Sequence, residues 1–387
     1  MEQEGTNEKT NRLDPLDALR AFAIFLIFAL HAAIMVELPP TTSNFIFYTP
    51  AWAGVWMLFV LSGYLIGKGF RTDRYKSKIE YVKKRFVRIC VPYYVFMFTL
   101  LLLLHPGLPV NDPITFLRIL TFTYNGIPRG IGYGGMWFVS TLMQFYIISL
   151  FFEILVRKIG KNRHACTVLF VVILVSGLLL RQFLYMSLIE FPSDIWSNWI
   201  KYVYTLSLTN LDLFFCGFLL SWIMINERGQ RYNPQPERRT AVLTPVVILA
   251  LLSMVVFFAY CQALEPIDSG RSVFYMYRGQ TLTILVTCLY IYCLDRSVRQ
   301  HNERLSLSAV KKNPFRIVEC FAAISLGFYF WHPIVLNRTV FVLQPQHTLG
   351  DHLITMAIAG ILTVLMATIF YYSVEKWSAR ILRKSKD

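Results

Sequence analysis

The sequence predicts an all-α, polytopic integral membrane protein with about ten transmembrane helices and both termini in the cytoplasm. Three observations predict this fold class. Hydrophobic residues make up 55% of the 387 residues and charged residues only 16%, which a water-soluble domain of ordinary composition does not show. The chain contains repeated apolar runs long enough to cross a hydrocarbon core. Basic residues lie between these runs, so the net charge of +15 indicates membrane orientation and argues against nucleic-acid binding.

Ten apolar runs follow a polar segment, residues 1–15, which we expect to be a disordered cytoplasmic tail. Each run has about the length that a transmembrane helix needs. The runs cover residues 17–36, 51–70, 89–105, 136–156, 165–181, 203–224, 241–261, 278–294, 317–337 and 353–374. A weaker run near 114–124 is interrupted by Arg118, and we interpret it as an interfacial or re-entrant piece.

The distribution of Lys and Arg predicts the orientation, because basic residues concentrate in cytoplasmic loops. With the N-terminus inside, 31 of the 38 Lys and Arg fall on the cytoplasmic side. The predicted outer loops hold the other seven, which are Arg118, Arg129, Arg181, Lys201, Arg271, Arg278 and Arg338. We expect one transmembrane domain over 16–377, a basic cytoplasmic tail over 378–387 and no appended soluble domain. We also expect no cleavable signal peptide, because the first run ends in VELPP.

Small side chains within the runs are predicted to serve packing. The seven cysteines lie within or beside the runs and show neither a CxxC pair nor metal-ligand spacing, so we interpret them as buried apolar residues and expect no metal site. In the second run, FVLSGYLIG, Ser62 and Gly63 favour a close approach of a neighbouring helix.

The first run, LDALRAFAIFLIFALH, carries ionisable residues, which in a membrane span indicate a functional site. Arg20 and His31 are eleven residues apart, so their side chains share one helical face, about 16 Å apart along the axis. Asp17 stands in position for an i,i+3 ion pair that would hold the guanidinium. Taken alone, Arg20 could also be a cytoplasmic anchor of the kind that the positive-inside rule describes. His31 alone could be a buried histidine with a partner inside the bundle. The co-facial pair favours function.

The loop after the second run is the most basic part of the chain and leads into the motif RFVRICVPYY. It includes Lys84, Arg85 and Arg88. A cytoplasmic flank, or contact with anionic lipids, would account for the charge alone. The spacing adds that Arg85 and Arg88 face the same way, and two guanidinium groups so placed suit a phosphate. The sequence therefore predicts a cytoplasmic ligand that carries phosphate.

Three further residues lie toward the outer ends of predicted spans. Trp137, in GYGGMWFVS, is typical of an aromatic-belt anchor. His332, in SLGFYFWHP, precedes a proline that leaves one backbone carbonyl without a helical partner. Asp212, near Asn210 in an apolar run, could orient a histidine, bind a sugar hydroxyl or join an interhelical network. The sequence does not decide among these roles.

These motifs resemble those of the membrane-bound acyltransferase 3 family, which includes O-acetyltransferases of bacterial surface polysaccharides. The resemblance rests on LDALRAFAIFLIFALH, FVLSGYLIG, the arginine pair before ICVPYY, MWFVSTLMQFY, SLGFYFWHP and the closing FYYSVEKW, in family order from residue 14 to 377. Leu142 and Met143 stand where many members carry acidic residues, which looks more like the branch without an extracytoplasmic SGNH domain.

The resemblance implies transfer of an acetyl or other short acyl group from cytoplasmic acyl-CoA, with acetyl-CoA as the expected donor, to a hydroxyl of a cell-surface carbohydrate at the bacterial cytoplasmic membrane. The expected roles are catalysis for His31, Arg20 and Asp17, donor binding for Arg85, Arg88 and Lys84, and acceptor binding for Trp137, His332 and Asp212. An imidazole suits the general base or an acyl carrier. A guanidinium suits donor binding or a developing oxyanion.

Two other function classes fit parts of the sequence. A proton-coupled transporter or flippase of an envelope precursor would place Arg20, His31 and Asp212 along a substrate path, and it needs no acyl donor. A structural subunit of an envelope-synthesis complex would use the same residues only to hold helices together. Replacing His31 would then lower the amount of folded protein rather than the activity of a folded protein.

Overall fold

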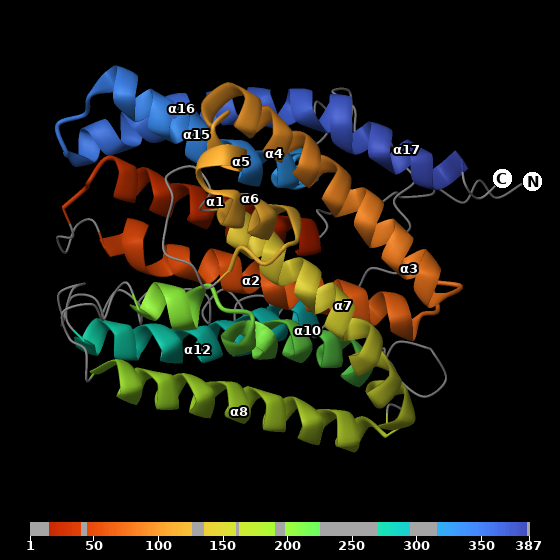
Figure 1. Cartoon of the computed structure of the whole chain (residues 1–387). Coiled ribbons are helices and arrows are strands. Elements are labelled where there is room, and N and C mark those ends of the chain that lie inside the picture. The colour runs from red at the N-terminus through yellow and green to blue at the C-terminus, as the bar shows by residue number, and fades with distance from the viewer. Residues whose placement is uncertain are drawn as a thin grey trace, which may run out of the picture.

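In the computed structural model, the described residues are 15–39, 45–125, 135–159, 162–189, 198–224, 270–294 and 316–384. Within these ranges the chain is helical and has no strand, as the predicted fold class requires (Figure 1). The tail 1–14 and the predicted span 241–261 lie outside the described residues. The other nine predicted runs fall on helices or on consecutive helical segments.

The long helices are α1 Pro15–Met35, α2 Phe45–Arg71, α4 Val91–Leu104, α7 Met136–Ile159, α8 Arg163–Ile189, α10 Leu211–Ile223, α12 Gly270–Leu294, α15 Ser325–Leu343 and α16 Leu349–Phe370. The shorter segments are α3 Lys78–Arg85, η1 Phe86–Cys90, α5 Leu108–Asn111, α6 Pro113–Leu120, η3 Ile200–Tyr204, η4 Leu208–Asn210, α14 Arg316–Ala323, η5 Tyr371–Glu375 and α17 Lys376–Lys384.

Several of these helices are long and apolar enough to cross a membrane. Among the described residues, α1, α2, α7, α8 and α16 meet this test, and α14 with α15 would add a sixth span if the pair, bent by 76°, is taken as one. The run near 114–124 forms α6, which has eight residues and is too short to span. The predicted total of ten spans and the cytoplasmic termini remain predictions.

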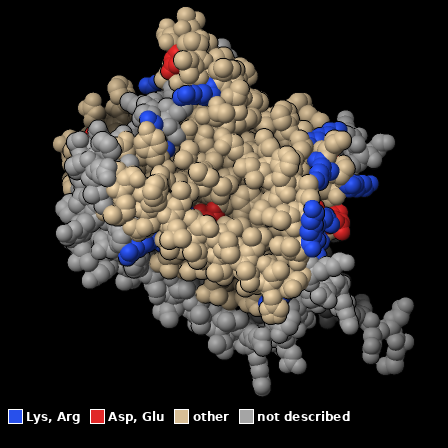
Figure 2. Space-filling view, turned by 60° about the horizontal axis from the view of Figure 1, so that its bottom comes forward, with Lys and Arg blue, Asp and Glu red and all other residues tan. Residues whose placement is uncertain are grey.

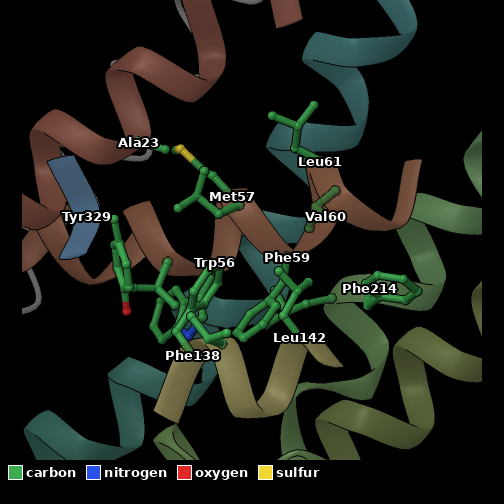
Figure 3. Close-up of a cluster of buried hydrophobic side chains, with 14 of the residues drawn as sticks. Ala23, Trp56, Met57, Phe59, Val60, Leu61, Phe138, Leu142, Phe214 and Tyr329 are labelled. Atoms are coloured by element: carbon green, nitrogen blue, oxygen red, sulfur yellow. The ribbon is translucent and has the colours of Figure 1, made fainter. Parts of the chain in front are cut away.

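The helices stack in layers with α2 at the centre. In Figure 1, α8 lies on one side, followed by α10 and α12, then α2 and α1, and finally α15 and α16. Figure 3 shows side chains of α2 among those of α1, α7, α10 and α15. The labelled side chains are Trp56, Met57, Phe59, Val60 and Leu61 of α2, with Ala23, Phe138, Leu142, Phe214 and Tyr329 around them.

Glycines let α2 and α10 touch backbone to backbone. A Cβ at Gly63 would lie 1.8 Å from the carbonyl oxygen of Phe214, and a Cβ at Gly217 would lie 2.1 Å from that of Val60. No larger side chain fits at either position without separating the helices. The close approach predicted from Ser62 and Gly63 is therefore confirmed. The six cysteines in the described part of the chain are free thiols, and five of them are buried.

One face of the molecule is a broad apolar surface. Figure 2 views the side that carries α8 and shows Lys and Arg gathered toward opposite margins of this surface. Only 6% of the apolar window of α8 is buried, and residues such as Val168 and Phe183 point outward. A surface of this kind needs hydrocarbon as its solvent, because water contact with it is unfavourable.

The prediction that Arg181 lies in an outer loop, which was based on the distribution of Lys and Arg, is wrong. Helix α8 continues to Ile189, and Arg181 is fully buried within it, with Nη2 2.7 Å from Oδ2 of Asp212 on α10. The charge rule assumes that a basic residue at the end of an apolar run lies in the aqueous flank. A carboxylate on the neighbouring helix instead lets the guanidinium stay inside the bundle.

Candidate active site

Two histidines meet inside the helix bundle. His31 on α1 and His332 on α15 are 2.7 Å apart between Nδ1 of the first and Nε2 of the second. His332 is 1% exposed, whereas His31 is only partly buried. Of the two residues, His31 therefore has the larger solvent-accessible surface. Two residues that the sequence placed in different roles thus form one hydrogen-bonded pair.

The predicted ion pair at the start of α1 is confirmed. Nη1 of Arg20 lies 2.9 Å from Oδ1 of Asp17, and both side chains keep partial exposure. The pair fixes the guanidinium by a local i,i+3 contact. Because it is partly solvated, its contribution to stability is small. Its effect on Arg20 is mainly orientation.

Arg20 and the arginine pair before α4 belong to one cationic group. Desolvation by the surrounding protein, with the positive charges of Arg85 and Arg20, lowers the pKa of Arg88. The side chain of Arg88 still has solvent-accessible surface, so water or a ligand can enter beside it. The group remains positive at neutral pH, since arginine does not lose its proton there. The positive charges of Arg20 on α1 and of Arg74 therefore add to those of Arg85 and Arg88, and this region is positive.

Tyrosines surround Arg85. Its Nη2 donates to the hydroxyl oxygen of Tyr75 over 2.6 Å, and its guanidinium carbon lies 5.5–5.9 Å from the ring centres of Tyr75, Tyr81 and Tyr146. Cation–π contact stabilises the charge without neutralising it. Lys84 is more strongly engaged, because Nζ lies 2.7 Å from Oε1 of Glu80. Arg85 therefore keeps a full positive charge in a fixed place, whereas Lys84 is partly neutralised.

Trp137 does not contact the histidine pair, but ring contacts of its neighbours connect the two regions. It is half-buried at the start of α7, and its ring centre is 4.8 Å from that of Tyr204. The next residue, Phe138, packs 5.1 Å from the ring of Tyr329, which in turn lies 5.7 Å from the ring of His332. The hydroxyl of Tyr329 donates to the carbonyl of Gly135 over 3.0 Å. These contacts join the start of α7 to the wall beside the histidines.

Asp212 lies in a different place from the histidine pair. It is 2% exposed and faces Arg181. Arg181 also donates to the carbonyl of Thr209 and to Oγ1 of Thr281, over 3.0 and 2.9 Å. The structure therefore contains the interhelical network that the sequence left as one of three roles for Asp212. Among the described residues, no three His, Cys, Asp or Glu side chains gather to hold a metal ion.

Glu375 is a residue that the sequence reasoning did not place in the site. Its Oε1 accepts a hydrogen bond of 3.1 Å from the backbone N–H of Gly327, near the start of α15. It also lies within the electrostatic influence of Arg88. Glu375 belongs to the closing motif FYYSVEKW, so the sequence marked the residue as part of a family motif. The sequence could not show that it contacts the start of α15. Glu375 therefore links the start of α15 to the cationic group.

Fold and site together define a helical membrane protein in which one helix presents a guanidinium to a cationic group and an imidazole to a second, buried histidine. Residues 14–372 match the acyltransferase domain of the acyltransferase 3 family. The chain belongs to this family of membrane-integral proteins.

Two relatives show the same relationship at low identity. The chain is 24% identical over 352 residues to the peptidoglycan O-acetyltransferase OatA of Listeria monocytogenes, covering 85% of this chain and 50% of that protein. It is 24% identical over 386 residues to the putative peptidoglycan O-acetyltransferase YrhL of Bacillus subtilis, covering 93% of this chain and 54% of that protein. The chain spans about half the length of these curated relatives. No solved structure matches it.

Proposed function

We propose that this protein is a membrane O-acyltransferase that moves an acetyl or another short acyl group from cytoplasmic acyl-CoA to a hydroxyl of a cell-surface carbohydrate. One observation carries the proposal: α1 presents Arg20 to the cationic group around Arg88 and, further along, His31 to the pair with His332. Because the relatives are named for peptidoglycan, a peptidoglycan glycan is the first acceptor to test.

The donor would bind at the cationic group. Coenzyme A carries several phosphates, and guanidinium groups bind phosphate through charge-assisted, paired hydrogen bonds. Arg88 offers the most accessible cation, Arg85 is held by its tyrosines, and Lys84 adds positive charge at the rim. Arg20, oriented by Asp17, would bind the donor at this end of α1, and the thioester end of the donor would extend along the helix to His31.

The acyl transfer would take place at His31. The acceptor hydroxyl gives its proton to the imidazole while its oxygen bonds to the carbonyl carbon of the thioester. The carbon–sulfur bond then breaks, and the departing thiolate takes the proton back from the imidazole. Atoms and charge balance in this sequence, so no metal or redox partner is required. Because Arg20 and His31 are separated along α1, donor and acceptor would approach from opposite ends of the helix.

The acceptor would be held beside Trp137. An indole face suits the apolar face of a sugar ring, and the residue is half-buried. His332 and Asp212 are almost fully buried, so direct contact with the acceptor falls mainly to Trp137. We also propose ten spans over 16–377 in the bacterial cytoplasmic membrane. The tails 1–15 and 378–387 would lie in the cytoplasm with the donor.

The test is turnover of labelled acetyl-CoA by purified protein in nanodiscs, following release of free CoA and transfer of label. We expect turnover by wild type, its loss in His31→Ala, and retention in His347→Ala, which removes a half-exposed histidine near the outer end of α16. Equal thermal stability of the variants shows that each is folded. Absence of turnover or binding with acetyl-CoA and with longer acyl donors would instead support the transporter hypothesis.

A further inference from the structure

The protonation of His332 is determined by its surroundings on α15. Its Nδ1 lies 3.1 Å from the carbonyl oxygen of Phe328. The carbonyl of Tyr329, one residue further along, has no helical N–H partner because residue 333 is proline. A carbonyl oxygen only accepts hydrogen bonds, so Nδ1 of His332 must carry a proton.

This assignment leaves Nε2 of His332 as an acceptor. A ring that is 1% exposed within an apolar helix is neutral at rest, because burying an imidazolium without an acidic partner is costly. A neutral imidazole with a proton on Nδ1 has a lone pair on Nε2. The proton in the 2.7 Å contact with His31 is therefore supplied by Nδ1 of His31.

The geometry of the two rings agrees with a hydrogen bond in their planes. The ring centres are 4.9 Å apart, almost the largest separation that a 2.7 Å contact between ring nitrogens allows. The rings therefore meet edge to edge, and their planes differ by only 20°. Phe28 and Phe328 pack against the ring of His332, which limits its rotation. The donor and the acceptor lone pair point at one another.

We propose that His332 is a positioning residue that holds His31 in one tautomer, with the proton on Nδ1 and the lone pair on Nε2 directed to the acceptor hydroxyl. This inference rests on the proposed function, in which His31 is the general base. When Nε2 takes the hydroxyl proton, Nδ1 of His31 keeps its hydrogen bond to His332. The carbonyl of Phe328 then stabilises the positive charge through the ring of His332, in the place that an acidic residue takes in a catalytic triad.

Two substitutions separate this role from simple packing. His332→Phe keeps an aromatic ring but removes the acceptor, so His31 loses its preference for one tautomer. We expect kcat to fall on the order of 100-fold or more, with KM for acetyl-CoA unchanged. His332→Gln offers an amide oxygen to Nδ1 of His31 and should retain more activity than His332→Phe. The matched control is His352→Phe, the same change at a fully buried histidine of α16, which should leave kcat within about twofold of wild type.

A spectroscopic measurement tests the tautomer without turnover. In protein labelled with ¹⁵N-histidine, NMR distinguishes protonated from unprotonated ring nitrogens, and the signals of His31 are assigned by their loss in His31→Gln. We expect a protonated Nδ1 and a bare Nε2 in wild type, and a mixture of tautomers in His332→Phe. An Nε2-protonated His31 in the resting enzyme, or a His332→Phe variant with normal kcat, would overturn the inference. An active His31→Ala would overturn the proposed function itself.

Discussion

The buried ion pair between Arg181 and Asp212 gives a quantitative prediction. Nη2 and Oδ2 are 2.7 Å apart, and the side chains are 0% and 2% exposed. Asp212→Ala would leave a guanidinium buried in the bundle without its carboxylate. Removing one partner of a buried pair costs about 3–5 kcal/mol. Replacing both partners by apolar residues, Arg181→Met with Asp212→Leu, removes the uncompensated charge and is often neutral or stabilising.

Thermal unfolding in identical nanodiscs at one scan rate compares the three proteins. A loss of 3–5 kcal/mol corresponds to a Tm lowered by at least several degrees. We expect Asp212→Ala to show this fall and the double variant to recover most of it. The double variant should also keep acetyl-CoA turnover, because the pair does not touch the histidines or the cationic group.

Two results would refute this reasoning. A double variant as unstable as Asp212→Ala would show that the polar network, rather than charge pairing, stabilises this part of the bundle. A folded Asp212→Ala variant with unchanged Tm and no turnover would give Asp212 a role in substrate binding, which the sequence alone left open.

Three further predictions concern the donor site and the helix packing. Arg85→Ala with Arg88→Ala should raise KM for acetyl-CoA by at least about tenfold, since each charge-assisted hydrogen bond is worth about 1.5–3 kcal/mol. Lys158→Ala at the end of α7 is the control, and an unchanged KM would remove the pair from the donor site. KM of the wild type should rise with added salt, because salt screens accessible charges; a salt-independent KM would contradict electrostatic donor binding. Gly63→Leu should lower Tm or prevent folding, since even a Cβ meets a carbonyl oxygen at 1.8 Å, whereas Ser62→Ala should be mild. Normal stability of Gly63→Leu would contradict the α2–α10 contact.

Apolar run length predicted where most helices lie, because a span must satisfy its backbone within the helix. The predicted runs could not show where helices break. Phe86–Cys90 forms a π-helical turn between α3 and α4, and a 76° bend separates α14 from α15. Hydropathy reports neither break, although Pro92 at the start of α4 lacks the N–H that would bond to the carbonyl of Arg88. Arg181 was misplaced for a related reason, since its partner on α10 is distant in the sequence.

The sequence predicted those contacts of the candidate site that join residues of the same helix. The ion pair of Asp17 with Arg20 and the shared face of Arg20 and His31 follow from helical spacing. The contact of His31 with His332 joins residues 301 positions apart, and no periodicity in a single sequence reveals such a pairing. The same holds for the gathering of Arg20 with Arg88 from different helices. The sequence therefore identified the members of the site apart from Glu375, and the tertiary structure shows which of them meet.

In the proposed reaction, one site accepts an acyl group from a cytoplasmic donor and passes it to an acceptor on the other side of the membrane. Proteoliposomes loaded with a soluble peptidoglycan fragment, and given membrane-impermeant labelled acetyl-CoA outside, test this directly. Molecules inserted with their cytoplasmic face outward should place label on the enclosed glycan, and His31→Ala should not. Label that appears only on glycan added to the same side as acetyl-CoA, or equal transfer by His31→Ala, would contradict the account.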